Sequence, residues 1–339
     1  MIRIGVDAMG GDYAPRSVVE GSILATLESQ GKYQVVLVGD KKRIEEEFKQ
    51  IEMDIPDIEI VNASQVIEMN DPPVESLKKK RDSSISVITR CLGKGEFDGI
   101  VSAGNTGAFM ASTLLSSGKI EGVIRPTIGS YMPGEKNISF ILDVGANSNC
   151  KPAHLLQFGI MGSIFVSTML KRKNPKVGLL SIGEESSKGN ELTIESYKLF
   201  EKSCLNFIGN IEGGDIFKGK ADVIVCDGFV GNIILKFTES IIDMVKEKLK
   251  VIMGNNFITK LGILLVKPAL QKMSYLYDYQ EYGGVPLLGV KGTAIIGHGG
   301  SSSKAIKNAI LEAYRMIREN INGKIAEKLS SYVEVESEK

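Results

Sequence analysis

Histidine and cysteine are scarce in this sequence of 339 residues, which contains two histidines and four cysteines. With His154 and His298 as the only imidazoles, neither a histidine-based triad nor a histidine-rich metal site is expected. The cysteines lie far apart and form no Cys-x-x-Cys pair, so neither a disulfide framework nor a zinc site is indicated. We therefore expect reduced thiols, and chemistry that uses no metal ion and no cofactor.

The sequence also lacks net charge, an export signal and long apolar runs. Lys and Arg total 41, as do Asp and Glu, so we expect no nucleic-acid partner. The strand-like residues 2–6 follow Met1 directly and leave no room for a leader. All apolar runs are much shorter than the roughly 20 residues of a membrane-spanning helix. These features predict a cytoplasmic protein.

Two nucleotide-binding signatures are missing as well. No loop has the Walker A pattern, and none has Gly-x-Gly-x-x-Gly with an acidic residue about 20 positions later. ATP and NAD therefore have no specific support in the sequence.

What the sequence does contain is a repeated alternation of strand and helix. Short β-branched runs are each followed by glycine and polar residues and then by a helical pattern, which predicts an α/β protein with a mostly parallel sheet. Helices are expected at about 15–30, 83–93, 107–117, 153–172, 190–203, 230–252 and 302–321. The length favours two lobes, which we place at residues 1–125 together with 290–330 and at residues 126–289. The Ser- and Glu-rich residues 331–339 are expected to fray.

Six glycine-rich junctions between strand and helix stand out. They are residues 6–12, 101–107, 142–147, 183–190, 226–232 and 297–302. Because strands of a parallel sheet end at one carboxyl edge, we expect these loops to converge there. Glycine lets backbone N–H groups approach an anion, and the following helix adds its positive end. Turn geometry alone explains any single loop, but the Asp, Asn, Ser, Thr and Lys in all six favour a shared anion site.

Two side chains in these loops are candidates for catalysis. Lys188, between two serines and Gly189, can place an ammonium group on an anion, or it is simply a solvated loop lysine. Asn232 follows Gly231 at the start of a long helix, where it either caps the helix or donates to a developing oxyanion. Of the histidines, His298 lies in a glycine loop, whereas His154 near a helix start is expected to be structural or on the surface.

Residues 257–273 alternate apolar side chains with lysines. Such a basic amphipathic segment could lie on an anionic membrane surface or pack against a second subunit.

Taken together, these loops resemble a bacterial family, the phosphate acyltransferases of phospholipid synthesis, over about residues 1–325. The matching blocks are residues 7–12, 102–108, 142–147, 183–190, 227–232 and 283–289. There are two departures. Asn149 stands where the family commonly has aspartate, and Gly300 stands where a serine often follows His-Gly, which weakens any role of that last loop.

The resemblance implies a three-layer α/β/α fold related to isocitrate dehydrogenases and phosphotransacetylases. It implies transfer of a fatty acyl group from acyl-acyl carrier protein to inorganic phosphate, giving acyl phosphate for phosphatidic acid and phospholipid synthesis. It also implies a homodimer that attaches peripherally to the membrane. The product would pass to an acyl-phosphate:glycerol-3-phosphate acyltransferase.

The residues agree with this chemistry. Phosphate is already an anionic oxygen nucleophile near neutral pH, and a thiol leaving group has a pKa near 8.5, so no histidine base is needed. We assign Lys188 to phosphate and the developing charge, and Asn232 to the carbonyl oxygen. The predicted phosphate-binding and positioning residues are Asp7, Gly10, Gly11, Gly104, Asn105, Thr106, Gly107, Asn147, Gly189, Asn190, Asp227, Gly228, Gly231 and His298.

Three alternatives stay open at this point. The first is a phosphotransacetylase-like enzyme that uses acyl-coenzyme A. The second is a metal-dependent dehydrogenase of the same fold, although no clear aspartate triad for a metal is present among the loops. The third is a noncatalytic scaffold that binds the membrane surface through residues 257–273 and organises lipid enzymes.

Overall fold

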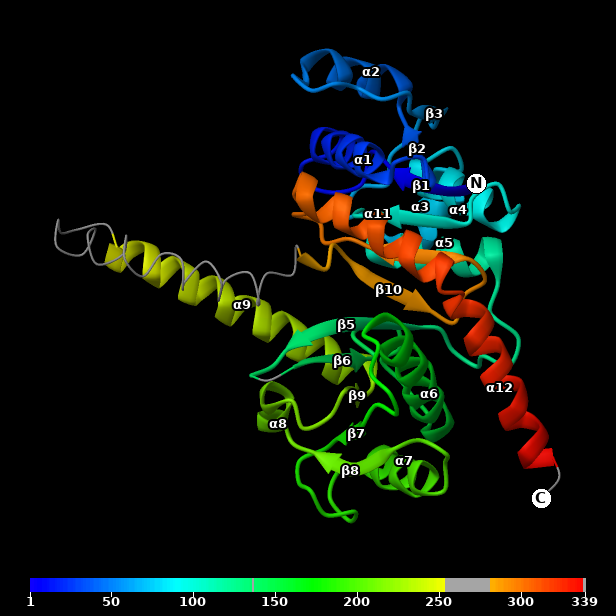
Figure 1. Cartoon of the computed structure of the whole chain (residues 1–339), viewed down its shortest axis with the longest axis vertical. Helices are drawn as coiled ribbons and strands as arrows, with labels where there is room; N and C mark the ends of the chain where they lie inside the picture. Colours follow the sequence, from blue (N-terminus) through cyan, green and yellow to red (C-terminus); the bar gives the residue numbers. More distant parts are fainter. Residues whose placement is uncertain (136, 254–280, 338–339) are drawn as a thin grey trace.

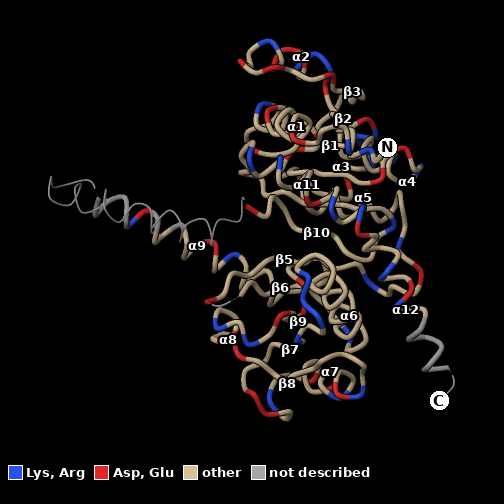
Figure 2. The backbone as a smooth tube through the Cα atoms, viewed as in Figure 1, with Lys and Arg blue, Asp and Glu red and all other residues tan. Residues whose placement is uncertain are grey.

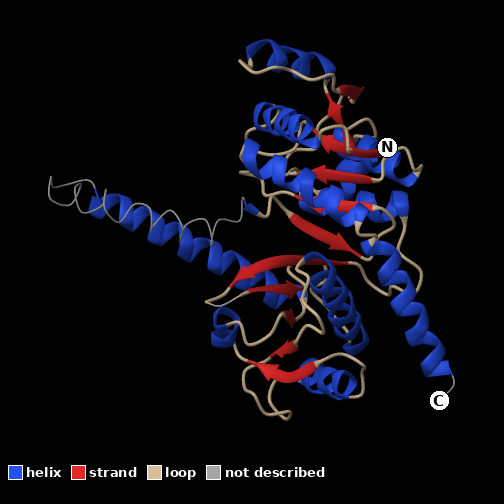
Figure 3. Cartoon of the chain, in the orientation of Figure 1, coloured by secondary structure: helices blue, strands red, loops and turns tan. Residues whose placement is uncertain are grey.

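The computed structural model shows a single 11-stranded sheet covered by helices on both faces (Figures 1 and 3). The structure describes residues 1–135, 137–253 and 281–337. The strand order is β3-β2-β1-β4-β11-β10-β5-β6-β9-β7-β8. The strands are β1 (Ile2–Asp7), β2 (Tyr33–Gly39), β3 (Glu59–Asn62), β4 (Gly99–Ser102), β5 (Thr127–Pro133), β6 (Ile138–Leu142), β7 (Val177–Leu180), β8 (Phe207–Ile211), β9 (Val223–Val225), β10 (Val285–Leu288) and β11 (Thr293–Ile296).

The sheet contains two parallel groups that run in opposite directions. β3, β2, β1, β4 and β11 are mutually parallel, and so are β6, β9, β7 and β8. Between them, β10 pairs antiparallel with β11 and β5, and β5 pairs antiparallel with β6. The second group is therefore reversed relative to the first.

This reversal corrects the expectation that all the glycine-rich loops share one carboxyl edge. The loops after β1, β4 and β11 leave one edge of the sheet, and those after β6, β9 and β7 leave the other. Sheets twist by roughly 20–25° per strand pair, so the four pairings from β4 to β6 turn the strand direction by about 90°. The two sets of loops are thus no longer on opposite sides of the molecule.

Helices cover each half of the sheet on both faces. On the first half, α1 and α11 pack on one face and α4, with α5 and α3 beside it, on the other. On the second half, α6, α7 and α12 lie on one side, while α8 and α9 contact β5 and β6. The helices are α1 (Arg16–Ser29), α2 (Lys41–Gln50), α3 (Pro73–Lys79), α4 (Ser84–Gly93), α5 (Thr106–Ser117), α6 (Pro152–Met169), α7 (Glu191–Glu201), α8 (Gly213–Lys218), α9 (Gly228–Met253), α11 (Ser303–Arg318) and α12 (Ile321–Ser337).

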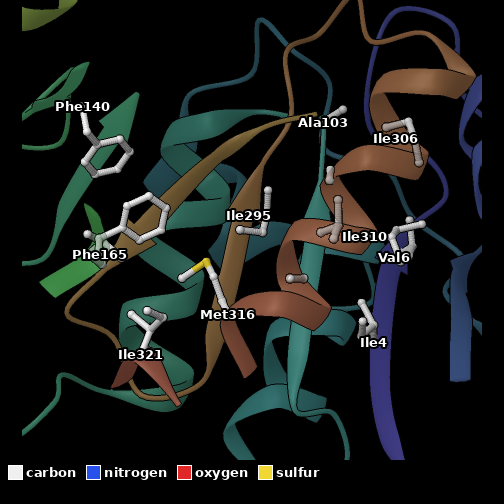
Figure 4. Packing of buried hydrophobic residues seen from close by; sticks show 14 of the residues in the cluster. Ile4, Val6, Ala103, Phe140, Phe165, Ile295, Ile306, Ile310, Met316 and Ile321 are labelled. Atoms are coloured by element: carbon white, nitrogen blue, oxygen red, sulfur yellow. The ribbon is translucent and has the colours of Figure 1, made fainter. Parts of the chain in front are cut away.

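Each face of the sheet carries its own apolar core. Alternate residues of β2 point to opposite faces, so Val35 and Leu37 join one cluster and Val36 and Val38 the other. The first cluster is continuous from Ile4 in β1, through helix α11, to Phe140 in β6 (Figure 4). Both halves of the sheet therefore fold around shared layers.

The helices expected from the sequence are confirmed, each within a few residues. Helix α12 extends to Ser337, with no glycine or proline in the sequence after Gly323. The fraying of residues 331–339 stays a prediction. The segment 257–273 lies outside the described residues. The division into two lobes stays a prediction.

Lys and Arg are interspersed with Asp and Glu along the backbone of both halves, in keeping with the balanced charge (Figure 2). In the part of the chain that the structure describes, no helix is both long and apolar enough to span a membrane.

Candidate functional site

Asp7, at the end of β1, organises the loops of the first half. Its side chain is buried and accepts hydrogen bonds from the Ser102 hydroxyl at 2.7 Å and the Met9 backbone N–H at 3.1 Å. Burial raises the pKa of the Asp7 carboxyl above its ordinary value, and these hydrogen bonds oppose that rise. Because the carboxyl faces inward, its contribution is to hold the β1 and β4 loops together.

The glycines of these loops permit close backbone contact. A Cβ on Gly10 would lie 2.6 Å from the Gly104 nitrogen, so this contact between the β1 and β4 loops requires glycine at position 10. The β11 loop joins them, since the Asp12 N–H donates to the Gly299 carbonyl at 2.8 Å and Gly11 lies against the same oxygen. The three loops form one continuous backbone surface.

Asp143 has the corresponding position in the second half, directly after β6. It is fully buried and accepts hydrogen bonds from the backbone N–H groups of Ile128, Gly145, Ala146 and Asn147. The Asn147 amide also donates to it, at 2.9 Å. Burial raises the pKa of this carboxyl, while the Asn147 amide and the backbone donors lower it. Asp143 therefore fixes the loop of residues 143–147.

The start of α9 packs tightly on this loop. A Cβ on Gly231 would lie 1.9 Å from the Asp143 carbonyl oxygen, and one on Gly228 would lie 2.7 Å from the Asn147 carbonyl oxygen. Asn232 comes next and lies beside Gly145, whose Cβ position is 3.7 Å from the Asn232 Oδ1. The Asn232 amide has no hydrogen-bond partner among the described residues. It is thus held at the loop with its donors available.

An apolar cavity of about 400 Å³ connects the two halves. Thr106 and His298 come from the first half, and Val144 and Asn232 come from the second. Most other lining residues are apolar, and they include Met69, Ile128, Met132, Leu235, Ile242, Val285 and Ile296. Along β5 the cavity extends from Ile128 to Pro133, roughly 17 Å at the rise of a strand. We call this the apolar cavity.

A second cavity, of about 740 Å³, lies between α5 and the loop of residues 143–147. Gly107 and Asn147 line it, with the cationic side chains of Lys119, Arg125 and Lys151. We call this the basic cavity. The two cavities share no lining residue, but the same two loops border both, because Thr106 lines one and Gly107 the other, and Val144 lines one and Ala146 the other.

The loop that carries Lys188 lies outside both cavities. Lys188, Gly189 and Asn190 follow β7, whose carboxyl end is next to that of β9 in the sheet. Lys188 is exposed, and its side chain stem packs on Gly183. The structure thus places this loop at the same edge as Asn232, one strand away.

Several predicted site residues are occupied in holding the fold. Asn105, Asn190 and Asp227 accept hydrogen bonds from the first turns of α5, α7 and α9 and so act as N-caps. The Asn105 amide also donates to three backbone carbonyls, those of residues 68, 69 and 71. The Asn147 amide donates to Pro126 and to Asp143. These amides position the loops.

Sequence reasoning did not select Asp143, Arg125 or Lys151 as site residues. A signal for Asp143 existed, since it ends an apolar strand just before a glycine-containing loop, as Asp7 does. Arg125 and Lys151 carry no local pattern, because only the fold brings them to one cavity. Within the described ranges, no cluster of three or more His, Cys, Asp or Glu suits a metal ion.

His154 offers a test of the charge around the basic cavity. Burial, and then the nearby Arg125 and Lys151, lower the pKa of this imidazole below its ordinary value. As the pH falls, His154 therefore becomes protonated at a higher pH in the unfolded chain than in the folded protein. The stability that His154 contributes is complete above about pH 6.5 and is lost as the pH falls further, by at most about 1.4 kcal/mol per pH unit.

We expect His154→Gln to flatten the pH dependence of the free energy of unfolding between about pH 7 and about pH 5, measured with urea. Glutamine keeps an acceptor for the Lys151 N–H, which donates to the His154 Nδ1 at 3.1 Å. An unchanged slope in the variant would contradict the lowered pKa.

Comparison with known proteins gives a consistent picture. A sequence profile of the family described as "Fatty acid synthesis protein" matches residues 2–324. The chain is 47% identical over 334 residues to the phosphate acyltransferase of Heliobacterium modesticaldum, covering 98% of this chain and 99% of the relative. It is 44% identical over 333 residues to the phosphate acyltransferase of Pelotomaculum thermopropionicum, covering 98% of this chain and 95% of the relative.

Solved structures share the fold at low sequence identity. A phosphotransacetylase from Streptococcus pyogenes superposes with a TM-score of 0.61 at 15% identity, covering 94% of each chain. The EutD phosphotransacetylase from Staphylococcus aureus gives 0.57 at 16% identity, also covering 94% of each. At these identities the likeness concerns the fold alone.

Proposed function

The chain belongs to the phosphate acyltransferase family, and on that basis we propose that it transfers a fatty acyl group from acyl carrier protein to inorganic phosphate. The observation that carries this proposal is the position of Asn232. Its uncommitted amide borders an apolar cavity long enough for an acyl chain, near the glycine loops proposed to bind phosphate. A thioester and orthophosphate would meet at this amide.

The proposed reaction is an acyl transfer. A phosphate oxygen attacks the carbonyl carbon of the thioester, forming a C–O bond and a tetrahedral oxyanion. The oxyanion then collapses, the C–S bond breaks, and its electron pair leaves with sulfur as the carrier thiolate. Any proton left on phosphate passes to solvent or to the thiolate. The products are acyl phosphate and the free carrier thiol.

Asn232 is proposed to act on the carbonyl oxygen. An amide N–H is a donor that stabilises negative charge as it develops, and it needs no change of protonation. The Asp143 loop supports this role, because it fixes the first turn of α9 through Gly231 and Gly228. The positive end of a long helix also lies beside the site.

Lys188 is proposed to bring a positive charge to phosphate. Its place outside the apolar cavity, on an exposed loop after β7, requires the loop to approach Asn232 when substrates bind. Gly189 provides the flexibility for this, with a φ of 115° that favours glycine. The remaining glycines of the β1, β4 and β9 loops, with His298, are proposed to complete the phosphate surroundings.

We also propose that the protein works as a homodimer at the inner face of the cell membrane. α9 extends away from the body of the molecule (Figure 1) and exposes an apolar stripe. Phe229, Ile233, Phe237 and Met244 on this helix are each more than half exposed. A second subunit would cover them, and the segment 257–273 would then contact lipid. The acyl phosphate would be consumed there by an acyltransferase acting on glycerol 3-phosphate.

Release of the carrier thiol tests the proposed function. Purified protein is incubated without metal ions with palmitoyl-acyl carrier protein or palmitoyl-coenzyme A, with and without phosphate. We expect thiol release that requires phosphate and is faster with the carrier protein. Preference for coenzyme A would favour the phosphotransacetylase-like alternative. Vesicle binding without any acyl phosphate would instead support a noncatalytic scaffold.

A further inference from the structure

The cations of the basic cavity have no acidic partner within the described ranges. Lys119 donates to the Ile124 carbonyl at 3.0 Å, and neither Arg125 nor Lys151 forms an ion pair with any described residue. No Asp or Glu is among the described residues that line the cavity. By contrast, Lys80 and Lys220 elsewhere pair with aspartates. Three unpaired cations around one cavity favour an anionic ligand.

A second observation shows that these charges act on the same space. His154 lines the cavity and is only 7% exposed, and both Arg125 and Lys151 disfavour its charged form. The α6 helix of 18 residues starts at Pro152, directly after Lys151, and adds its positive end. Side chains and backbone thus contribute to one positive region.

The size and walls of the cavity indicate more than an inorganic ion. Its volume of about 740 Å³ falls in the range of sites for extended organic ligands. Apolar side chains of α5 and of the β10 end form the walls, and they include Met110, Ala111, Leu114, Leu287 and Val290. The ligand should therefore combine a phosphate group with a long, largely uncharged arm.

The basic cavity also lies close to the proposed reaction centre. Ala146 and Asn147 line it, and Val144 of the same loop lines the apolar cavity together with Asn232. An arm that enters past Arg125 and Lys151 would present its far end beside the Asn232 amide. The acyl chain would then continue into the apolar cavity.

We propose that the basic cavity binds the phosphopantetheine arm of the acyl carrier, with its phosphodiester against Arg125 and Lys151. This assignment rests on the proposed function, which supplies a thioester at the end of that arm. It divides the substrates between the cavities: the arm occupies the basic cavity, and the acyl chain occupies the apolar one. Orthophosphate would then bind at the glycine loops near Asn232.

The test compares two double variants that remove equal charge. Arg125→Gln/Lys151→Gln alters the cavity, and Lys42→Gln/Arg43→Gln alters exposed cations of α2, at the far end of the first half of the sheet (Figure 1). Binding of phosphopantetheine and of pantetheine is measured without turnover. We expect the wild type and the control to bind phosphopantetheine about 10- to 100-fold more tightly than pantetheine, because only phosphopantetheine can form charge-assisted hydrogen bonds with the two cations. The cavity variant should lose that preference and bind pantetheine as before.

Turnover gives a second readout. For palmitoyl-phosphopantetheine, kcat/KM should fall by about the same factor in the cavity variant, while the KM for orthophosphate stays unchanged. An increased KM for orthophosphate with intact phosphopantetheine preference would assign the cavity to orthophosphate and overturn the proposal. Equal binding of phosphopantetheine and pantetheine by the wild type would also overturn it. Both double variants should unfold at the same temperature as the wild type, which serves as the control for folding.

These outcomes separate this inference from the proposed function. If the wild type makes no acyl phosphate but binds phosphopantetheine through Arg125 and Lys151, the proposed function fails and the cavity assignment stands. If acyl phosphate forms and the cavity variant binds phosphopantetheine as tightly as the wild type, the assignment fails alone.

Discussion

Replacing Asn232 with alanine is expected to lower kcat for acyl phosphate formation about 100- to 1000-fold, the usual effect of losing one oxyanion donor. The amide borders the apolar cavity and has no hydrogen-bond partner among the described residues, so its removal leaves no unsatisfied group behind. Folding should be intact. Asn149→Ala is the matched control, since Asn149 is exposed and lines neither cavity.

Lys188→Ala is expected to lower kcat by a similar factor, because the ammonium group is assigned to phosphate and to the developing charge. Lys198→Ala, on the exposed face of α7, is the control for the loss of a lysine. Steady-state rates with saturating acyl carrier protein and phosphate give the comparison. Near wild-type kcat in both the Asn232 and the Lys188 variants would reject the assignment.

Gly231→Ala is expected to destabilise the protein and abolish activity. The added methyl group would lie 1.9 Å from the Asp143 carbonyl oxygen, a backbone atom in a loop held by five hydrogen bonds to the Asp143 carboxyl. Neither the helix backbone nor the loop backbone can move away freely. The decrease in the free energy of unfolding should therefore reach or exceed the roughly 1–3 kcal/mol of ordinary overpacking. The first turn of α9, and Asn232 with it, would move.

Urea unfolding and kcat measure this effect together. Gly214→Ala is the control, because a Cβ there meets no atom within 4 Å. We expect the control to keep the wild-type midpoint and rate. A Gly231 variant with both quantities unchanged would contradict the tight contact between α9 and the Asp143 loop.

The sequence predicted the α/β architecture well because its signals are local. Apolar β-branched runs and amphipathic helices are read from neighbouring residues, and α5, α6 and α9 begin within two residues of their expected starts. α2 was not predicted, because it is highly charged and buries only Ile44. Its apolar positions, Ile44 and Phe48 with the following Ile51, have helical spacing but are few.

The reversal of strand direction was harder to foresee. β5 and β6 are separated by only four residues, 134–137, which does favour an antiparallel hairpin. β10 and β11 are likewise separated by only four residues, 289–292. The pairing of β10 with β5, however, joins strands far apart in the sequence, and no local pattern specifies it. The orientation of the two loop groups depends on it.

The candidate site was predicted in part. The loops were found through their glycine and polar residues, and the structure joins Asp7 with Gly10 and Gly104, and Asn147 with Gly228. Residue type did not reveal what each side chain does. Asn105 caps α5 and Asn232 is the fifth residue of α9, and among the described residues only the Asn105 amide has hydrogen-bond partners. That difference depends on residues far away in the chain.

The origin of the oxygen atom that becomes bonded to the acyl carbon tests the central claim most directly. Palmitoyl-acyl carrier protein is incubated, without metal ions, with phosphate in which all four oxygens are ¹⁸O, and the product is analysed by mass spectrometry. Direct attack by phosphate predicts acyl phosphate that retains all four labelled oxygens, formed in equal amount to the free carrier thiol. Thiol release that yields free fatty acid, or that proceeds equally without phosphate, would contradict the account.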